Sequence, residues 1–310
     1  KLSFSSKYKL NKKLDKLPTG PDWECEPITV KGDHVDRHWK PLTEEIELWH
    51  HNPVKCICEL IGNPAFKDHL AYLPKCVFGN IKETNWLYNE MWTAEWWWKI
   101  QESMQRGAFV APVILASNKT QLSNFGSDKS AWPVYLTISN LSKEICQCPS
   151  CHGTVLIGYL PITKLQCFSK SIHLLEIYWL FHKCMLKLVN PLVAAGKQGV
   201  EMTCADSLIQ KIFPILTAYI ADYPEQCLVA CCKENQCPHC VVPLEERSEL
   251  LETVKLQDLA TTLGILNAYK KDEDPPPQFA KQGLRSIYKP FWRHLPHTNI
   301  FTFITPDILH

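Results

Sequence analysis

The middle of the chain carries three short apolar runs that are rich in β-branched residues. They cover Phe109–Ala116, Trp132–Ile138 and Thr154–Leu160, and Gly, Ser and Asn lie between them. Short apolar runs bounded by turn residues are typical of buried strands. The pattern therefore predicts three consecutive strands, which we expect to pair antiparallel.

Helical spacing of the apolar residues follows these runs. Over Cys167–Val193 apolar side chains recur every three or four positions, which predicts an amphipathic helix. Val200–Ala205 then predicts a fourth strand, and Leu208–Ile220 predicts a second amphipathic helix that Pro214 should kink. Cys227–Cys231 predicts a fifth strand.

The order of these elements favours a mixed α+β fold of the α/β class. Three antiparallel strands, a crossover helix, and then a parallel strand and helix make up the ribonuclease-H-like arrangement, a mixed sheet flanked by helices. Many other α/β sheets begin in the same way. We expect this core over residues 107–232. Before it we expect a basic, mostly disordered lead-in over 1–41 and a helical Trp-rich region over 42–106. After it we expect a zinc knuckle, a Pro-rich linker and the incomplete C-terminal part of the catalytic region, over 233–310.

Two patterns shape the region before the core. Residues 42–62 predict two short helices that are broken at Asn52-Pro53. Residues 86–105 carry a stripe of Trp and Met side chains. An aromatic stripe can stack nucleic-acid bases. At helical spacing it is more often a core face, which is the interpretation that we favour.

Composition narrows the class of protein. The chain has 310 residues, of which 45% are hydrophobic and 21% charged, an ordinary globular composition. Its formal net charge of +1 is low for a whole DNA-binding protein, so any DNA contact must be local. The basic start could provide one, but such a run is more often a solvated end. No apolar run reaches the roughly 18 residues of a membrane span, and no leader peptide is visible, so we expect neither a membrane nor a secreted protein.

Candidate catalytic acids follow from the expected sheet. A two-metal site holds Mg²⁺ or Mn²⁺ between carboxylates. Asp206 directly follows the fourth predicted strand, which should lie beside the first, although a helix N-cap explains Asp206 equally simply. After the first strand stands Asn118, which contributes no negative charge to a metal that prefers carboxylates. Asp128 is the nearest Asp, and a turn explains it better than a replacement ligand does.

Clustered cysteines are the second candidate site. Fifteen Cys in a chain of this size indicate a reducing compartment with some thiols as metal ligands. Cys237-Pro-His-Cys240 has the spacing of a zinc knuckle, so we expect structural Zn²⁺ there. Cys232 is a candidate third ligand, with Cys231 as its competitor, and the fourth could be His297 or His310. The cluster Cys146–Cys151 looks equally metal-like, but chance explains it as well.

The last four residues hold a third candidate. Asp307 and His310 are three positions apart and would share one face of a helix. Asp307 could be a cap and His310 a solvated side chain, or both could face the catalytic site or the zinc. The chain starts at Lys1 and stops at His310 in what reads as the middle of an element, so we expect a fragment.

Long stretches from about residue 45 to the end resemble the Plavaka transposases of fungal genomes, which are related to the CACTA group. The resemblance lies in Asn63–Tyr72, Asn89–Trp98, Ala111–Asn140, Thr154–Ser169, Gly199–Cys240 and Ile287–His310. It implies a cut-and-paste transposase with a metal-dependent ribonuclease-H-like core that acts on transposon-end DNA. By position, the family's two strand acids fall at Asn118 and Asp206, its Cys-Pro-x-Cys motif at Cys237 and Cys240, and its Asp-x2-His motif at Asp307 and His310. The last catalytic acid is expected downstream of this chain.

Two departures decide the expected function: Asn118 stands in the place of the first catalytic Asp, and the last catalytic acid is missing from the chain. We expect a transposase fragment that has lost strand cleavage, in the nucleus or the cytoplasm, which by family analogy works as a homo-oligomer on DNA. Two alternatives stay open. Another acid such as Asp128 could replace the lost ligand, or the chain could be a non-enzymatic DNA- or protein-binding module.

Overall fold

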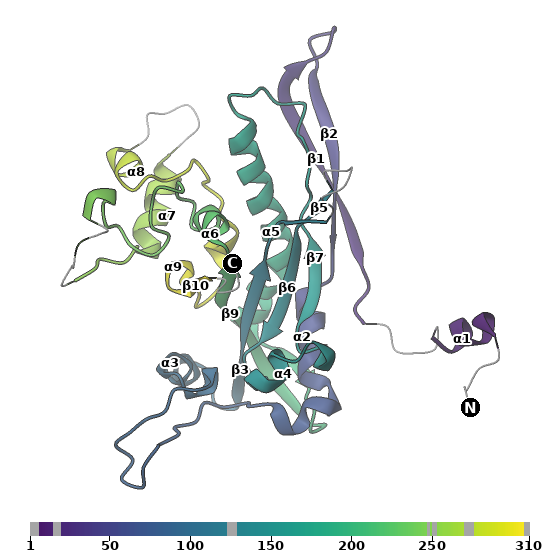
Figure 1. Cartoon of the computed structure of the whole chain (residues 1–310), viewed down its shortest axis with the longest axis vertical. Helices are drawn as coiled ribbons and strands as arrows, with labels where there is room; N and C mark the ends of the chain where they lie inside the picture. The colour runs from purple at the N-terminus through teal and green to yellow at the C-terminus, as the bar shows by residue number, and fades with distance from the viewer. Residues whose placement is uncertain are drawn as a thin grey trace.

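The central element of the fold is a mixed sheet. The computed structural model describes residues 6–14, 20–122, 129–246, 249, 253–269 and 276–306. The sheet has eight strands, namely β1 (Glu24–Val35), β2 (Pro41–His50), β3 (Ala108–Ser117), β6 (Pro133–Ile138), β7 (Val155–Tyr159), β8 (Val200–Thr203), β9 (Ile209–Ala221) and β10 (Ile304–Pro306). Seven of them follow the order β1-β2-β7-β6-β3-β9-β10, and β8 pairs with β9 (Figure 1). The short strands β4 (Thr120–Gln121) and β5 (Ser130–Ala131) form a separate pair.

Helices surround the sheet. They are α1 (Lys7–Leu14), α2 (Pro53–Gly62), α3 (Glu95–Ser103), α4 (Lys143–Cys146), α5 (His173–Gln198), α6 (Tyr223–Val229), α7 (Leu259–Ala268), α8 (Pro277–Lys281) and α9 (Ile300–Phe303). The 3-10 helices are η1 (Pro64–His69), η2 (Met91–Thr93), η3 (Pro149–Cys151), η4 (Leu244–Glu246) and η5 (Phe291–His294). A mixed α+β fold is thus confirmed. Across the described ranges, no helix is both long and apolar enough to cross a membrane.

The three predicted strands of the middle region are confirmed as β3, β6 and β7. β3 pairs antiparallel with β6, and β6 pairs antiparallel with β7. The predicted crossover helix is α5, which begins at His173 and continues to Gln198. It leads to β9, which lies parallel to β3 on the side away from β6. The crossover therefore returns the chain to the first strand of the region.

Two predicted elements after α5 are wrong. Residues 208–220 form not a helix but most of β9, a central strand in which Ile212 through Thr217 are all buried. A strand covered on both faces loses the alternation of a half-buried strand, so its continuous apolar run can be mistaken for a helix. Residues 227–231 form not a strand but the end of α6 and the turn after it. The fourth strand, β8, pairs antiparallel with β9 and does not touch β3.

The region before β3 also differs from prediction. Residues 24–35, expected in a disordered lead-in, form β1, and residues 41–50 form β2 instead of a helix. The two strands make a long antiparallel hairpin in which Glu24 pairs with His50. Ile28, Ile46 and Leu48 are buried on one face of this hairpin, and this tertiary burial stabilises strands whose local pattern is weak. The second predicted helix is confirmed as α2, which Asn52 caps by accepting a hydrogen bond from the Val54 amide at 3.0 Å.

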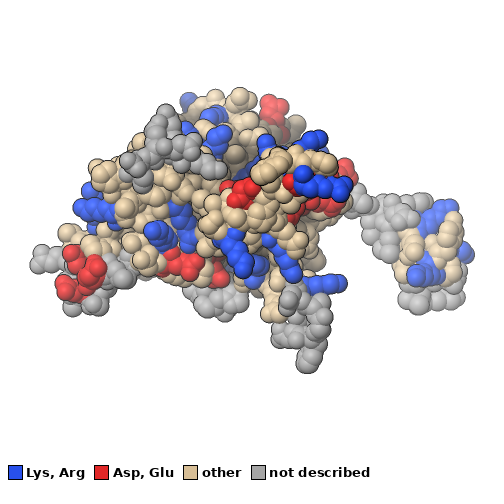
Figure 2. Space-filling model, turned by 90° about the horizontal axis from the view of Figure 1, so that it is seen from above, with Lys and Arg blue, Asp and Glu red and all other residues tan. Residues whose placement is uncertain are grey.

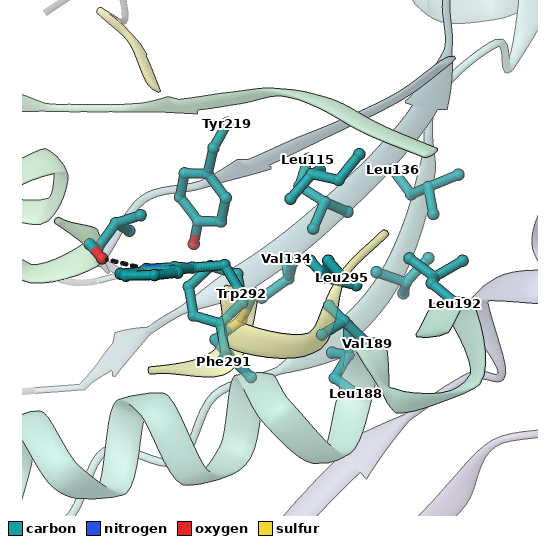
Figure 3. Packing of buried hydrophobic residues seen from close by; sticks show 14 of the residues in the cluster. Leu115, Val134, Leu136, Leu188, Val189, Leu192, Tyr219, Phe291, Trp292 and Leu295 are labelled. Carbon is teal, nitrogen blue, oxygen red and sulfur yellow. Dashed lines mark hydrogen bonds between the residues drawn. The ribbon is translucent and has the colours of Figure 1, made fainter. Parts of the chain in front are cut away.

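The main core lies between the sheet and α5. Leu115 and Leu136 from the sheet meet Leu188 and Leu192 from α5, and Phe291 of η5 closes the layer (Figure 3). On the other face, α3 buries Trp97 against Val110 and Ile215. Trp97 has no exposed surface, so the interpretation of the Trp stripe as a core face is confirmed at this residue.

Candidate active site

The parallel pair β3–β9 brings Asn118 and Asp222 to one edge of the sheet. Ala116 and Ile220 are Cα partners in this pair, and each is followed two positions later by one of these polar residues. Adjacent strands lie about 4.8 Å apart, and parallel strands end at the same edge. Catalytic and ligand-binding groups of open α/β sheets commonly lie at this carboxyl edge. β10 ends at the same edge, since Pro306 pairs with Ala221.

Asp206, the acid that the sequence placed beside Asn118, lies at the opposite end of the sheet. It sits in the turn of the β8–β9 hairpin, where its carboxylate accepts a hydrogen bond from the Leu208 amide at 3.0 Å. β9 has 13 residues, so its length separates Asp206 from the edge by roughly 40 Å at about 3.3 Å per residue. The expected proximity of Asn118 and Asp206 is therefore wrong, because Asp206 lies in the turn between β8 and β9.

Sequence reasoning missed Asp222. Asp222 is the N-cap of α6, and its side chain accepts a hydrogen bond from the Glu225 amide at 2.9 Å. Asp, then Pro224 in the first turn, then Glu225 at the third helical position is a recognisable helix start. The apolar run Cys227–Cys231, which predicts a strand, masks this helix start.

The buried carboxyl group of Glu225 forms hydrogen bonds next to this edge. Glu225 of α6 accepts hydrogen bonds from the Ser117 hydroxyl and, at 3.0 Å, from the Trp132 indole nitrogen. The Tyr219 hydroxyl lies 2.5 Å from the Ser117 hydroxyl and 3.4 Å from Glu225. Burial raises the pKa of Glu225 to about 7, although the hydrogen bonds from Ser117 and Trp132 act in the opposite direction. Burial also raises the pKa of Tyr219. The network ties β3, β9 and α6 together directly beneath Asn118 and Asp222.

The candidate metal ligands at this edge differ in charge and in availability. Asp222 offers a carboxylate and Asn118 an amide oxygen, while the Glu225 carboxylate is occupied by three donor groups. Hard divalent cations prefer carboxylate ligands, so this pair fits one cation better than two. Asp128, Asp307 and His310 lie outside the described residues.

The cysteines proposed for zinc, Cys232, Cys237 and Cys240, each have contacts in the structure. The buried Cys232 thiol interacts with the Cys227 thiol of α6, which raises the pKa of Cys232 and lowers that of Cys227. Cys237 accepts a hydrogen bond from the His239 amide at 3.4 Å. Cys240 pairs with Leu256 in an isolated bridge. No group of three potential metal ligands occurs among the residues that the structure describes.

Cys231 and the cluster Cys146–Cys151 have side-chain contacts of their own. Cys231, the competitor of Cys232, places its thiol 3.5 Å from the Nε2 atom of His182. His182 is fully buried, and burial lowers its pKa to about 4. In the second cluster, Cys148 and Cys151 interact with each other, while Cys146 lies 3.8 Å from the Thr137 hydroxyl.

Comparison with known proteins identifies the family. No curated protein matches the chain. The family model described as Plavaka transposase matches residues 4–310. This match covers essentially the whole chain and agrees with the resemblance found in the sequence, so the chain belongs to the Plavaka transposase family.

Proposed function

We propose that this chain is a transposase-derived catalytic region, built on a ribonuclease-H-like sheet, that has lost DNA strand cleavage. The strand order β7-β6-β3-β9-β10 supports the sheet assignment. In it, β6 alone of the five runs antiparallel to β3, and α5 provides the crossover to β9. The order of elements in the sequence favoured this type of sheet, but it assigned the fourth and fifth strands to residues 200–205 and 227–231, and β9 and β10 occupy those places instead.

The parallel register that sets Asn118 beside Asp222 carries the proposal. In a two-metal site, bound Mg²⁺ or Mn²⁺ would activate the attacking oxygen and stabilise the leaving one. Asp222 is the acid of this edge that would hold such an ion, and Asn118 occupies the place of a second carboxylate. The neutral amide weakens the ion's binding, so the edge would hold a cation too weakly for cleavage.

Asp307 is proposed as a further acid of the same site. It immediately follows Pro306 in the sequence, and Pro306 ends β10. Its role is proposed from this sequence position and from the family motif that it shares with His310.

Zinc is proposed as a structural ion for Cys237 and Cys240, with Cys232 and His310 as the remaining ligands. A structural zinc site needs four ligands in tetrahedral arrangement. The described cysteines alone do not assemble three of them. No catalytic step depends on this ion.

DNA is the proposed partner, and transposon ends are the proposed target. The family suggests DNA binding in general. Figure 2 shows Lys and Arg side chains in several groups on the face seen from above, with acidic groups between them. Local basic groups of this kind fit phosphate contacts on a chain of net charge +1. Nuclear location and homo-oligomeric action belong to the same proposal.

Restoring the lost ligand tests the proposal. Supercoiled plasmid is incubated with Mn²⁺ and the purified chain. We expect no nicking by the original chain, nicking by Asn118→Asp with Asp307 as the remaining acid of the site, and none by Asn118→Asp with Asp222→Ala. Asn118→Asp with Asp206→Ala is the matched control and should nick as Asn118→Asp alone does. Nicking by the original chain that disappears with Asp222→Ala would overturn the loss of cleavage. Dependence on Asp206 instead of Asp222 would overturn the site.

The alternative is a non-enzymatic DNA- or protein-binding module, and Asn118 is the observation that favours it. This alternative predicts that the original chain retards DNA at low salt and that Asn118→Asp gains no Mn²⁺ affinity. If calorimetry finds that Asn118→Asp binds Mn²⁺ at least tenfold more tightly than the original chain, the result would instead support a catalytic site that lacks only the carboxylate at position 118.

A further inference from the structure

A cavity lies between the N-terminal hairpin, the first half of α5 and the C-terminal segment. Its volume is about 360 Å³, which falls in the range of small-molecule pockets. Besides the buried Phe168, three aromatic side chains line it: Trp179 from α5, Tyr269 after α7, and Tyr288 before η5. The Trp179 and Tyr288 rings meet edge to face with centroids 4.4 Å apart, and Tyr269 lies 6.4 Å from Tyr288. All three rings are half-buried, so each keeps surface for a ligand.

Neighbouring contacts hold the cavity in place. The Arg285 guanidinium lies over the Tyr178 ring at 3.8 Å, next to Trp179 in the helix. Arg285 also donates a hydrogen bond to the Cys232 carbonyl at 2.7 Å. These contacts fix the C-terminal segment against α5. The aromatic walls are therefore formed before any ligand arrives.

Charged groups line the same cavity. Lys31 of β1 and Lys183 of α5 are exposed at its rim, and the half-buried Glu176 carboxylate lines it. A carboxylate has about four lone-pair positions, so Glu176 can accept an additional N–H donor. Lysines are point charges that suit phosphates. The walls and rim thus match a flat aromatic ring with an amino group, attached to a phosphate-bearing chain.

The cavity adjoins the candidate active site. Leu180 lines this cavity and also a smaller one, whose walls include Lys119 and Trp132. Lys119 follows Asn118 in sequence, and Trp132 donates a hydrogen bond to Glu225. The Leu180 side chain of α5 is therefore a wall that the two cavities share.

We propose that this cavity receives one unstacked nucleobase with an exocyclic amine, from DNA bound at the carboxyl edge. The inference rests on the proposed function, because that function brings DNA to the edge. The base stacks on Trp179, and the Tyr288 ring, inclined by 63° to Trp179, meets the edge of the base. The amine of the base donates a hydrogen bond to Glu176, and Lys31 and Lys183 contact the neighbouring phosphates. Stacking on aromatic side chains is a general mode of binding unpaired bases, and it is tolerant of sequence. Enzymes that act on DNA also place bases taken out of the stack in aromatic pockets.

A fluorescent base tests this inference on the full chain. The probe is a 30-base-pair duplex with one bulged 2-aminopurine, a base with an exocyclic amine whose fluorescence falls when it stacks. Anisotropy of a fluorescein label measures duplex binding separately. We expect the original chain to quench the bulged probe several-fold. Trp179→Leu should lose the quenching and bind the bulged duplex about tenfold more weakly, with unchanged affinity for the fully paired duplex.

Matched variants keep the test decisive. Trp49→Leu changes a tryptophan that is 44% exposed and does not line this cavity, and it should leave the quenching intact. Glu176→Gln should keep the quenching and bind the bulged probe more weakly. Melting curves of each variant separate loss of the cavity from loss of the fold, and Tyr288→Leu replaces Trp179→Leu if the latter does not fold.

Each other outcome overturns a different statement. Duplex binding without quenching by the original chain would overturn the base pocket and leave the DNA proposal standing. Quenching that survives in both Trp179→Leu and Tyr288→Leu would also overturn the pocket. Equal quenching of free 2-aminopurine deoxynucleoside monophosphate would overturn DNA as the source of the base. No binding of either duplex at low salt would overturn DNA binding itself.

Discussion

The Trp132 indole nitrogen donates a hydrogen bond to the Glu225 carboxylate at 3.0 Å, across 93 positions of sequence. The same carboxylate accepts a hydrogen bond from Ser117, the last residue of β3. Glu225 thus joins the end of β3, the start of β6 and the first turn of α6. This buried junction supports the edge that carries Asn118 and Asp222.

Removing the junction should destabilise the fold. Glu225→Ala leaves Ser117, Tyr219 and Trp132 without their acceptor, and we expect a loss of about 3 kcal/mol in the free energy of unfolding, measured with urea. Glu234→Ala is the matched control, because its side chain is 59% exposed in an ion pair with Arg285. It should cost less than about 1 kcal/mol. Equal losses for the two variants would contradict a structural role of the junction.

Titration of Glu225 should make the free energy of unfolding depend on pH. Burial raises its pKa from 4.5 to about 7, so the folded chain holds this proton to higher pH than the unfolded chain. Its contribution is complete below about pH 4.5 and is lost as the pH rises through about 7. The size of this loss is on the order of 3 kcal/mol.

His182 changes stability in the opposite direction. Burial lowers its pKa from 6.5 to about 4, so its contribution is present above about pH 6.5 and lost as the pH falls through about 4. The free energy of unfolding is therefore measured with urea from pH 4 to 8 for both the original chain and Glu225→Gln. Both chains contain His182, so its effect drops out of the difference between their free energies of unfolding. This difference should shrink as the pH rises, and a difference that stays constant across the range would count against a protonated Glu225.

Asn118→Asp should make the chain responsive to metal. The added carboxylate lies beside Asp222, so without metal we expect like-charge repulsion and a lower melting temperature. Mn²⁺ at about 100 times its dissociation constant should then stabilise the variant by about 2.7 kcal/mol. The original chain and Asn118→Asp with Asp222→Ala should show smaller shifts. If Asp222→Ala leaves the shift unchanged, the ion binds elsewhere.

The Trp stripe can be tested for its core role. Trp97 is fully buried against Val110 and Ile215, and Trp97→Ala should cost about 3–5 kcal/mol in unfolding free energy. Trp39, which is 85% exposed, provides the control, and Trp39→Ala should cost less than about 0.5 kcal/mol. A small loss at Trp97 would reopen a role for the stripe in binding.

Zinc can be measured directly. If the zinc proposal holds, elemental analysis of the purified chain should find about one zinc per chain, and a chelator should lower the melting temperature. Cys237→Ser with Cys240→Ser should remove the metal. Cys25→Ser, which changes an exposed thiol of β1, should retain it. A chain free of zinc after purification with added zinc would exclude the ion.

Local pattern by itself determined much of the core. β3, β6 and β7 were predictable because each is a short apolar run with turn residues beside it, and α5 because its apolar residues keep helical spacing. Asn118 was found for the same reason, since its place depends only on where β3 ends. These features depend on residues close together in the sequence, and the periodicity of apolar residues is sufficient to predict them.

Tertiary structure alone decided β9, the β1–β2 hairpin and the acid at the site. β9 is covered on both faces by distant segments, which erases the alternation that marks a strand. The hairpin is stabilised by packing against the core, which its own weak pattern does not show. Once β9 is a strand, its parallel register with β3 selects Asp222 and moves Asp206 to the far end. The choice of acid therefore follows from strand pairing across about one hundred residues, which local sequence cannot specify because pairing depends on the whole fold.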